Sequence, residues 1–154
     1  MEHEPISRED SVIVGYRHTG VNVTNLGLAV DFYCDLLGLR VVERRTETGR
    51  YIDALTGLEG VLLHWAKVGG PDGVLLELVE FASQKHIKVS KKRDYATIGC
   101  NHLCFTVTGI EDYERRCKAA GVRTHPIQTD PPGKVRNMVC YDPDGTIIEL
   151  VEVL

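Results

Sequence analysis

A nine-residue pattern of apolar and polar positions occurs twice in the chain. It reads DGVLLELVE at 72–80 and DGTIIELVE at 144–152, and in each copy a glutamate, Glu77 or Glu149, stands between aliphatic residues. Alternation with a period of two predicts a β-strand, and the Asp-Gly pair before it predicts a turn. A glutamate in an apolar strand is costly to bury unless it is paired or binds a cation. The repetition therefore predicts a duplicated structural unit with a carboxylate at the same place in each copy.

A second repeat lies upstream of each of these strands. The stretch HTGVNVTNLGLAVDFYCDLLGL begins at His18, and the stretch HLCFTVTGIEDYERRCKAAGV begins at His102. Each starts with a period of two, continues with apolar residues near helical spacing and stops at a glycine, which predicts a strand followed by a helix. The helical apolar positions are Leu28, Phe32, Leu36 and Leu37 in the first copy, and Ile110, Tyr113, Cys117 and Ala120 in the second.

Three extended stretches follow each predicted helix. They are LRVVERR, VLLHWAKV and VLLELVEF in the first half, and VRTHPI, RNMVCYD and TIIELVEV in the second. Each half is therefore predicted to be a βαβββ module, in an α+β fold whose two modules form an open, curved, mixed β-sheet of barrel-like shape. The predicted organisation is a flexible tail at 1–11, a first module at 12–82, a linker at 83–97 and a second module at 98–154.

Composition and charge narrow the class of protein. The 154 residues are 43% hydrophobic and 26% charged, which is typical of a globular domain with a buried core. The formal net charge of −4 argues against a nucleic-acid partner, and no apolar run is long enough to predict a membrane span. The polar, acidic N-terminal stretch does not resemble a signal peptide, so we expect a cytoplasmic protein. Five cysteines without a C-x-x-C pair predict reduced, mostly buried thiols.

Comparison of the two halves leads to a hypothesis about two histidines and two glutamates that occupy equivalent positions. His18 and His102 begin the first strands, and Glu77 and Glu149 lie in the middle of the last strands. If the first and last strands of a module are neighbours, each module can direct one imidazole and one carboxylate into the same concavity. Such a set suits Zn, Ni, Co, Mn or Fe(II), and four protein ligands leave two positions open on a six-coordinate ion. The pattern thus predicts a divalent metal site.

These four residues and the stretches around them resemble the vicinal oxygen chelate superfamily, which includes glyoxalase I, methylmalonyl-CoA epimerase and the extradiol dioxygenases. The similarity covers about residues 12–153. It implies an open barrel around a divalent metal, with His18, Glu77, His102 and Glu149 as ligands, in a protein that forms a homodimer. The stretches FYCDLLGL, TGLEGVLLHWAKV and LLELVEF look more like a branch that contains epimerases of cyclic polyol ketones, such as 2-epi-5-epi-valiolone epimerase.

The reaction implied by the resemblance is an isomerisation or epimerisation, or a related lyase reaction, of a small molecule with adjacent oxygens. A metal that chelates both oxygens stabilises the charge that develops when a proton leaves the carbon next to a carbonyl. The resemblance makes Glu149 or Glu77 the catalytic base, and His64 is a second candidate because its strand is expected to lie beside Glu77. The residues expected to bind substrate oxygens are Lys67, Arg136 and Tyr141.

Two other functions fit the same resemblance. The first is an Fe(II) extradiol-type dioxygenase, which needs two histidines and only one carboxylate, so Glu77 as a fourth ligand argues against it. The second is a non-catalytic drug-binding protein of the bleomycin-resistance type, against which retention of all four positions argues. Glutathione and CoA are not indicated as ligands, because LVEFAS follows Glu77 and TIGCNH ends at His102, where relatives that bind these molecules carry other motifs.

Overall fold

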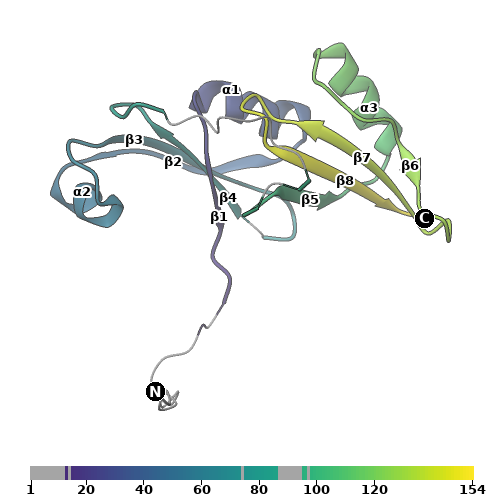
Figure 1. Cartoon of the computed structure of the whole chain (residues 1–154), viewed down its shortest axis with the longest axis horizontal. Coiled ribbons are helices and arrows are strands. Elements are labelled where there is room, and N and C mark those ends of the chain that lie inside the picture. The colour runs from purple at the N-terminus through teal and green to yellow at the C-terminus, as the bar shows by residue number, and fades with distance from the viewer. Residues whose placement is uncertain (1–12, 14, 74, 87–94, 97) are drawn as a thin grey trace.

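The computed structural model describes residues 13, 15–73, 75–86, 95–96 and 98–154. The predicted tail at 1–11 and most of the predicted linker, residues 87–94 and 97, lie outside the described residues. The remainder forms two βαβββ modules in sequence order (Figure 1), so the predicted α+β class is confirmed. No helix in the described ranges is long and apolar enough to cross a membrane.

The first module is a four-stranded mixed sheet. Its elements are β1 (Thr19–Asn22), α1 (Leu26–Val30), the π-helix η1 (Asp31–Leu36), β2 (Arg40–Thr48), α2 (Arg50–Thr56), β3 (Leu62–Gly69) and β4 (Leu75–Phe81). The strand order is β1-β4-β3-β2; β1 runs parallel to β4, and the other neighbours are antiparallel. The first and last strands of the module are therefore neighbours, which is the condition that the metal-site hypothesis requires.

The second module repeats this topology. Its elements are β5 (His102–Thr106), α3 (Ile110–Ala119), β6 (Gln128–Thr129), β7 (Val135–Tyr141) and β8 (Ile147–Val153), in the strand order β5-β8-β7-β6. The stretch VRTHPI was predicted to be a strand, but within it only Thr124 makes an isolated bridge, to Cys140. Pro126 lies in this stretch, and proline has no N–H to donate to a sheet.

Two local features of the first module differ from the prediction. The helix α2 is not predicted because it has no apolar stripe: Ile52 is buried, whereas Tyr51 and Leu55 are exposed. The helix that begins at Leu26 continues as the π-helix η1, in which the Leu37 N–H donates to the Phe32 carbonyl at 3.1 Å. This wider turn shifts the buried face away from the ideal helical spacing. Leu28, one of the predicted helical apolar positions, precedes the π-helix and is 57% exposed, because α1 buries Leu26 and Ala29 instead.

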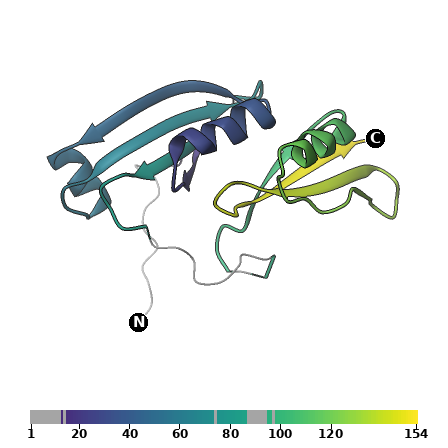
Figure 2. The same ribbon diagram turned by 90° about the horizontal axis from the view of Figure 1, so that it is seen from above.

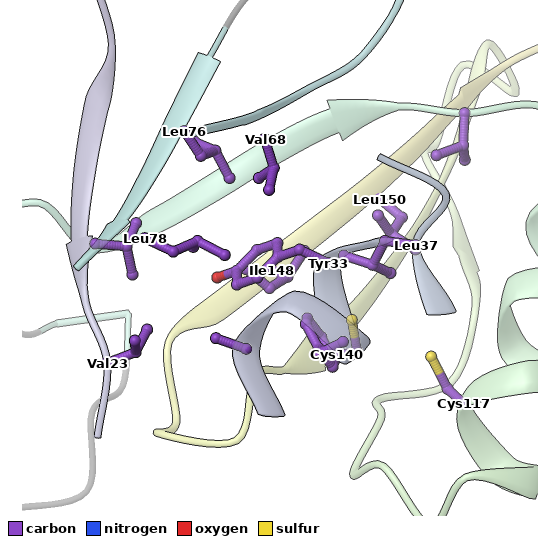
Figure 3. Packing of buried hydrophobic residues seen from close by; sticks show 14 of the residues in the cluster. Val23, Tyr33, Leu37, Val68, Leu76, Leu78, Cys117, Cys140, Ile148 and Leu150 are labelled. Carbon is purple, nitrogen blue, oxygen red and sulfur yellow. The ribbon is translucent and has the colours of Figure 1, made fainter. Parts of the chain in front are cut away.

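One hydrophobic core joins the two modules. Leu76 and Leu78 of β4 belong to the same buried cluster as Ile148 and Leu150 of β8, and Tyr33 of η1 lies between the two sheets (Figure 3). The strands therefore form two four-stranded sheets that share a core (Figure 2), and not one continuous barrel-like sheet. The physical reason is that both modules bury the same side of their last strand, the side that also contacts the helices.

Hydrogen bonds reinforce the contact between the modules. The Tyr33 hydroxyl donates to Asp142 Oδ2 at 3.0 Å, and this carboxylate also accepts the N–H groups of Asp144 and Thr146 at Oδ1. Near the surface, Thr24 donates its N–H and its hydroxyl to Asp144 at 2.8 and 2.6 Å. Burial raises the pKa of both Tyr33 and Asp142, so the pair depends on these hydrogen bonds for its stability.

The five cysteines are free thiols, as predicted, but fewer of them are buried than expected. Cys117 and Cys140 are fully buried in the shared core, where their thiols are hydrogen-bonded to each other. Cys34 is half-buried, and Cys100 and Cys104 are exposed.

We expect Tyr33→Phe to lower the free energy of unfolding by about 1–3 kcal/mol, because it leaves the buried Asp142 carboxylate without one of its donors. Urea unfolding followed by circular dichroism measures the change. Tyr51→Phe is the matched control, since Tyr51 is 74% exposed, and it should leave the unfolding midpoint unchanged. Equal midpoints for Tyr33→Phe and the wild type would show that this contact does not stabilise the fold.

Candidate metal centre

Side-chain alternation along the last strand of each module separates the candidate site from the core. In β4, Leu76 and Leu78 face the shared core, so Glu77 between them faces the other way. In β8, Ile148 and Leu150 face the core, and Glu149 faces away from it in the same manner. Both glutamates are therefore on the sheet faces that the shared core leaves open.

The first half-site consists of His18 and Glu77. His18 precedes β1 by one residue, and β1 pairs with β4 so that Gly20 is opposite Glu77, which places the imidazole on the same face. His18 Nε2 is 3.2 Å from Glu77 Oε2, and the two side chains are 28% and 22% exposed. The other carboxylate oxygen, Oε1, lies 3.6 Å from Lys67 Nζ. One oxygen of Glu77 thus faces the histidine, and the other faces a cation.

Lys67 is itself held in place by its neighbours on this face. Its ammonium group is 3.6 Å from Glu43 Oε2 and lies 4.5 Å from the centre of the Trp65 ring, while the side chain is only 16% exposed. The register explains the grouping, because Glu43, Lys67 and Glu77 are opposite one another on β2, β3 and β4. The sequence-based expectation that Lys67 lies at the site therefore agrees with its position, and Glu43 is a neighbour that the sequence analysis missed.

The second half-site consists of His102 and Glu149. His102 Nε2 is 3.5 Å from Glu149 Oε2, and Asn137 donates from Nδ2 to the other oxygen, Oε1, at 3.2 Å. His102 Nδ1 is 3.3 Å from Asn101 Oδ1, a contact that helps to orient the ring. Cys104 is opposite Glu149 in the register, and partial burial and this carboxylate raise the pKa of its thiol. The arrangement repeats that of the first half-site, except that a neutral amide replaces the ammonium group.

The geometry of each pair fits two ligands of one divalent ion. Two donor atoms at adjacent corners of an octahedral ion lie about 3 Å apart, because metal–ligand bonds are about 2.0–2.2 Å long. The separations of 3.2 Å and 3.5 Å between histidine and glutamate are close to this value. A hydrogen bond or ion pair to the outer carboxylate oxygen is also typical of a metal ligand. Each pair is therefore suited to supply one nitrogen and one oxygen donor.

The structure does not bring the two pairs together within one chain. Among the described residues, no group of three or more histidine, cysteine, aspartate or glutamate side chains could hold a metal ion. The reason lies in the fold, since Glu77 and Glu149 are both on the sides of their sheets opposite the shared core. The predicted set of His18, Glu77, His102 and Glu149 is thus present as two half-sites.

His64 does not lie beside Glu77, contrary to the interpretation of it as a catalytic base. Its strand is adjacent to β4 as expected, but the register places His64 opposite Glu80 and Lys67 opposite Glu77. Because neighbours along a strand alternate, His64 and Lys67 point to opposite faces of the sheet. His64 Nδ1 is hydrogen-bonded to the Thr46 hydroxyl at 2.8 Å, on the face away from the candidate metal ligands.

Arg136 is also on the opposite face from its predicted partners. It is opposite Glu152 in the register, three residues along the strand from Glu149 and therefore on the other face, and its guanidinium group pairs with both Glu152 and Glu111. Glu152 in turn accepts the N–H of Gly109, the residue before α3. Arg136 therefore attaches the start of α3 to the sheet, and the expectation that it binds substrate is not supported by its position.

Tyr141 lies on the same face as Glu149, where it joins aromatic residues that the sequence analysis did not assign. Its hydroxyl is 3.0 Å from His125 Nε2, and Arg123 stacks on its ring. Tyr95 lies 5.5 Å from His102, ring to ring, and its pKa is raised first by burial and then by Glu149 and Tyr141. Since Tyr95 belongs to the predicted linker, only the folded structure could place it at this half-site.

Comparisons with known proteins agree with the fold. Residues 15–150 match the model of the Glyoxalase/Bleomycin resistance protein/Dioxygenase superfamily. The protein YwkD of Bacillus subtilis is 28% identical over 123 residues, which cover 79% of this chain and 83% of YwkD.

Solved structures with the same fold include two bacterial proteins. A glyoxalase family protein from Bacillus cereus has a TM-score of 0.86 and 22% identity, over 95% of this chain and 98% of that chain. The fosfomycin resistance protein FosX from Listeria monocytogenes, solved with Mn(II) and sulfate, has a TM-score of 0.62 and 18% identity, over 93% and 95% of the two chains.

A pair of βαβββ modules defines a class of protein. The family model covers most of the chain and names that class. The protein belongs to the Glyoxalase/Bleomycin resistance protein/Dioxygenase superfamily.

We expect Arg136→Met to lower the stability at neutral pH and to have little effect in acid. Hydrogen bonds from Arg136 lower the pKa of Glu152 and of Glu111 in the folded protein. A carboxylate with a lowered pKa stabilises the fold above the unfolded pKa of about 4.3, and this contribution disappears as the pH falls through the folded pKa.

Urea unfolding of the wild type and of Arg136→Met at pH 7 and at about pH 2.5 measures this difference. Arg115→Met is the control, because Arg115 is 71% exposed and forms a surface ion pair with Asp112. A difference between Arg136→Met and the wild type that is the same at both pH values would contradict the role of these ion pairs.

Proposed function

We propose that this protein is a metal-dependent isomerase or epimerase that removes a proton from the carbon next to a carbonyl in a substrate with adjacent oxygens. The observation that carries the proposal is the pair of half-sites, each with a histidine nitrogen and a glutamate oxygen spaced as adjacent ligands of one ion. The Mn(II) in the structure of the similar protein FosX supports a divalent ion from the set Zn, Ni, Co, Mn or Fe(II).

A second copy of the chain completes the site in this proposal. His18 and Glu77 of one copy would meet His102 and Glu149 of another, because both pairs face away from the core of their own chain. A twofold axis that makes one such contact makes a second, identical one, so a homodimer would hold two equivalent sites. This arrangement accounts for four ligand-type residues that one chain keeps apart.

The bound ion would act as a Lewis acid toward negative charge on a substrate oxygen. Of the two glutamates, Glu149 is placed to take the proton. Glu77 shares an oxygen with the ammonium group of Lys67, whereas Glu149 receives only the neutral Asn137 amide and has no lysine or arginine partner in the described part of the chain. Glu149 therefore keeps a carboxylate oxygen whose charge is not balanced by a fixed side-chain cation.

The difference between the half-sites also makes the two sides of the completed site chemically different. Lys67 is opposite Glu77 in the first sheet, and the corresponding position opposite Glu149 in the second sheet is Val139. One side of the completed site would thus present a cation, and the other an apolar side chain. A substrate with a negatively charged oxygen at one end would bind with that end toward Lys67.

Hydrogen exchange at a small hydroxyketone tests the proposal. Hydroxyacetone in D2O should gain deuterium at its hydroxymethyl carbon when both the protein and Mn(II) are present, as measured by mass spectrometry. Glu149→Gln should slow this exchange by about a hundredfold, because a positioned base contributes that much or more. Glu80→Gln is the matched control, since Glu80 lies on the opposite face, where it accepts the Leu26 N–H, and it should change the rate less than about twofold.

Two outcomes would count against the proposed reaction. Exchange that is no faster than with Mn(II) alone would remove the evidence for enolisation. Consumption of O2 by the Fe(II)-loaded protein with a catechol would instead identify a dioxygenase.

A further inference from the structure

A cavity of about 410 Å³ lies on the face of the first sheet opposite the half-site. Its lining residues belong to β2, β3 and β4 and to the start of α1, elements that are labelled in Figure 1. Its volume is in the range of pockets that bind small metabolites. His64, which the half-sites do not use, is one of the residues that line it.

The floor of the cavity is built from one row of side chains across the sheet. Thr46, His64 and Glu80 are opposite one another on β2, β3 and β4. Arg44 belongs to the next row, where its partner on β3 is the small residue Ala66.

Hydrogen bonds to protein neighbours orient two of the polar groups in the cavity. The Thr46 hydroxyl is 2.8 Å from His64 Nδ1, which leaves Nε2 as the ring atom available to a ligand. Glu80 Oε2 accepts the Leu26 N–H at 2.7 Å, which leaves Oε1 available as an acceptor. Glu80 Oε1 and His64 Nε2 are thus held in one row of the sheet, and both stay available to a ligand in the cavity.

Arg44 supplies the charge that is not balanced by the protein. No ion pair or hydrogen bond to the Arg44 guanidinium group occurs among the described residues, whereas its neighbour Arg45 pairs with Glu43 on the other face. A guanidinium group presents a planar set of donors that matches a carboxylate. The cavity therefore combines a cation for a carboxylate and an acceptor for a hydrogen-bond donor.

The geometry points to a second small-molecule site in this cavity, for a carboxylate that also carries a hydrogen-bond donor, which is the chemistry of an amino acid. The carboxylate binds Arg44, and the ammonium group donates to Glu80 Oε1. The site is separate from the half-site because His64 and Lys67 point to opposite faces of β3. Its existence does not depend on the proposed metal chemistry.

Binding of L-phenylalanine to the metal-free protein tests this inference. Isothermal titration in the presence of EDTA should show saturable binding, and the NMR signals of the His64 ring should shift with the same dissociation constant. L-phenylalaninamide lacks the carboxylate and 3-phenylpropionate lacks the ammonium group, so each should bind about tenfold more weakly or worse. The full chain is used in every titration.

Two arginines of β2 provide a matched pair of variants. Arg44→Met should weaken the binding of L-phenylalanine by about tenfold or more, because it removes the cation for the carboxylate. Arg40→Met should change it by less than about twofold, because Arg40 lies on the same strand but is not among the residues that line the cavity. Both arginines are exposed, so neither change is expected to disturb the core.

The inference would be overturned by any one of three results. The first is no saturable binding of L-phenylalanine by the wild type. The second is unchanged affinity in Arg44→Met. The third is equal affinity for L-phenylalanine and its amide.

Discussion

The alternation of side chains along β4 and β8 controls the position of the two glutamates of the candidate site. In each strand, leucine and isoleucine side chains face a buried core that the two modules share, and the glutamate between them must face the opposite way. The hydrophobic effect therefore selects both the packing of the modules and the placement of their carboxylates. Glu77 and Glu149 avoid the cost of burial in the core because they occupy the open faces.

The same constraint explains why the half-sites remain apart in one chain. The core between the modules is closed by Tyr33, whose hydroxyl bonds to the buried Asp142, and by the hydrogen bonds from Thr24 to Asp144. These contacts use the helical sides of both modules, so the histidine and glutamate pairs are left at two separate surfaces. A metal with these four protein ligands then requires a second molecule of the chain. The fold is thus the reason for the proposed dimer.

Duplication also permits the two halves to diverge in function while their backbones stay alike. The strand orders β1-β4-β3-β2 and β5-β8-β7-β6 are equivalent, yet Lys67 in the first half corresponds to Val139 in the second. An ammonium group thus accompanies one glutamate, and an amide accompanies the other. We infer from this asymmetry that the first half-site contributes mainly to binding, and that the second contributes the base.

Much of this architecture could be predicted from the sequence, because the repeat shows which residues occupy equivalent places. The strands around Glu77 and Glu149, and their pairing with His18 and His102, follow from a period of two within each module. The faces of His64 and Arg136 could not be predicted in this way. They depend on the register between neighbouring strands, and a shift of one residue reverses the face.

Other features required long-range contacts that a sequence pattern does not specify. Leu28 lies on the exposed side of α1, and α2 has too few buried residues to show a helical pattern. The placement of Tyr95 beside His102 depends on the path of the segment between the modules. The sharing of one core by both modules decides whether the half-sites meet, and it involves residues more than a hundred positions apart, such as Tyr33 and Asp142.

A mixture of two defective variants tests whether each metal site combines the first pair of one chain with the second pair of another, as we propose. One variant carries His18→Ala and Glu77→Ala, and the other carries His102→Ala and Glu149→Ala, so neither should bind Mn(II) alone. After the subunits are mixed in equal amounts and allowed to exchange, half of the dimers should be mixed and each should hold one intact site. Metal analysis should then give about a quarter of the wild-type content per chain. A mixture that binds no Mn(II), although the wild type binds it, would contradict a site shared between chains.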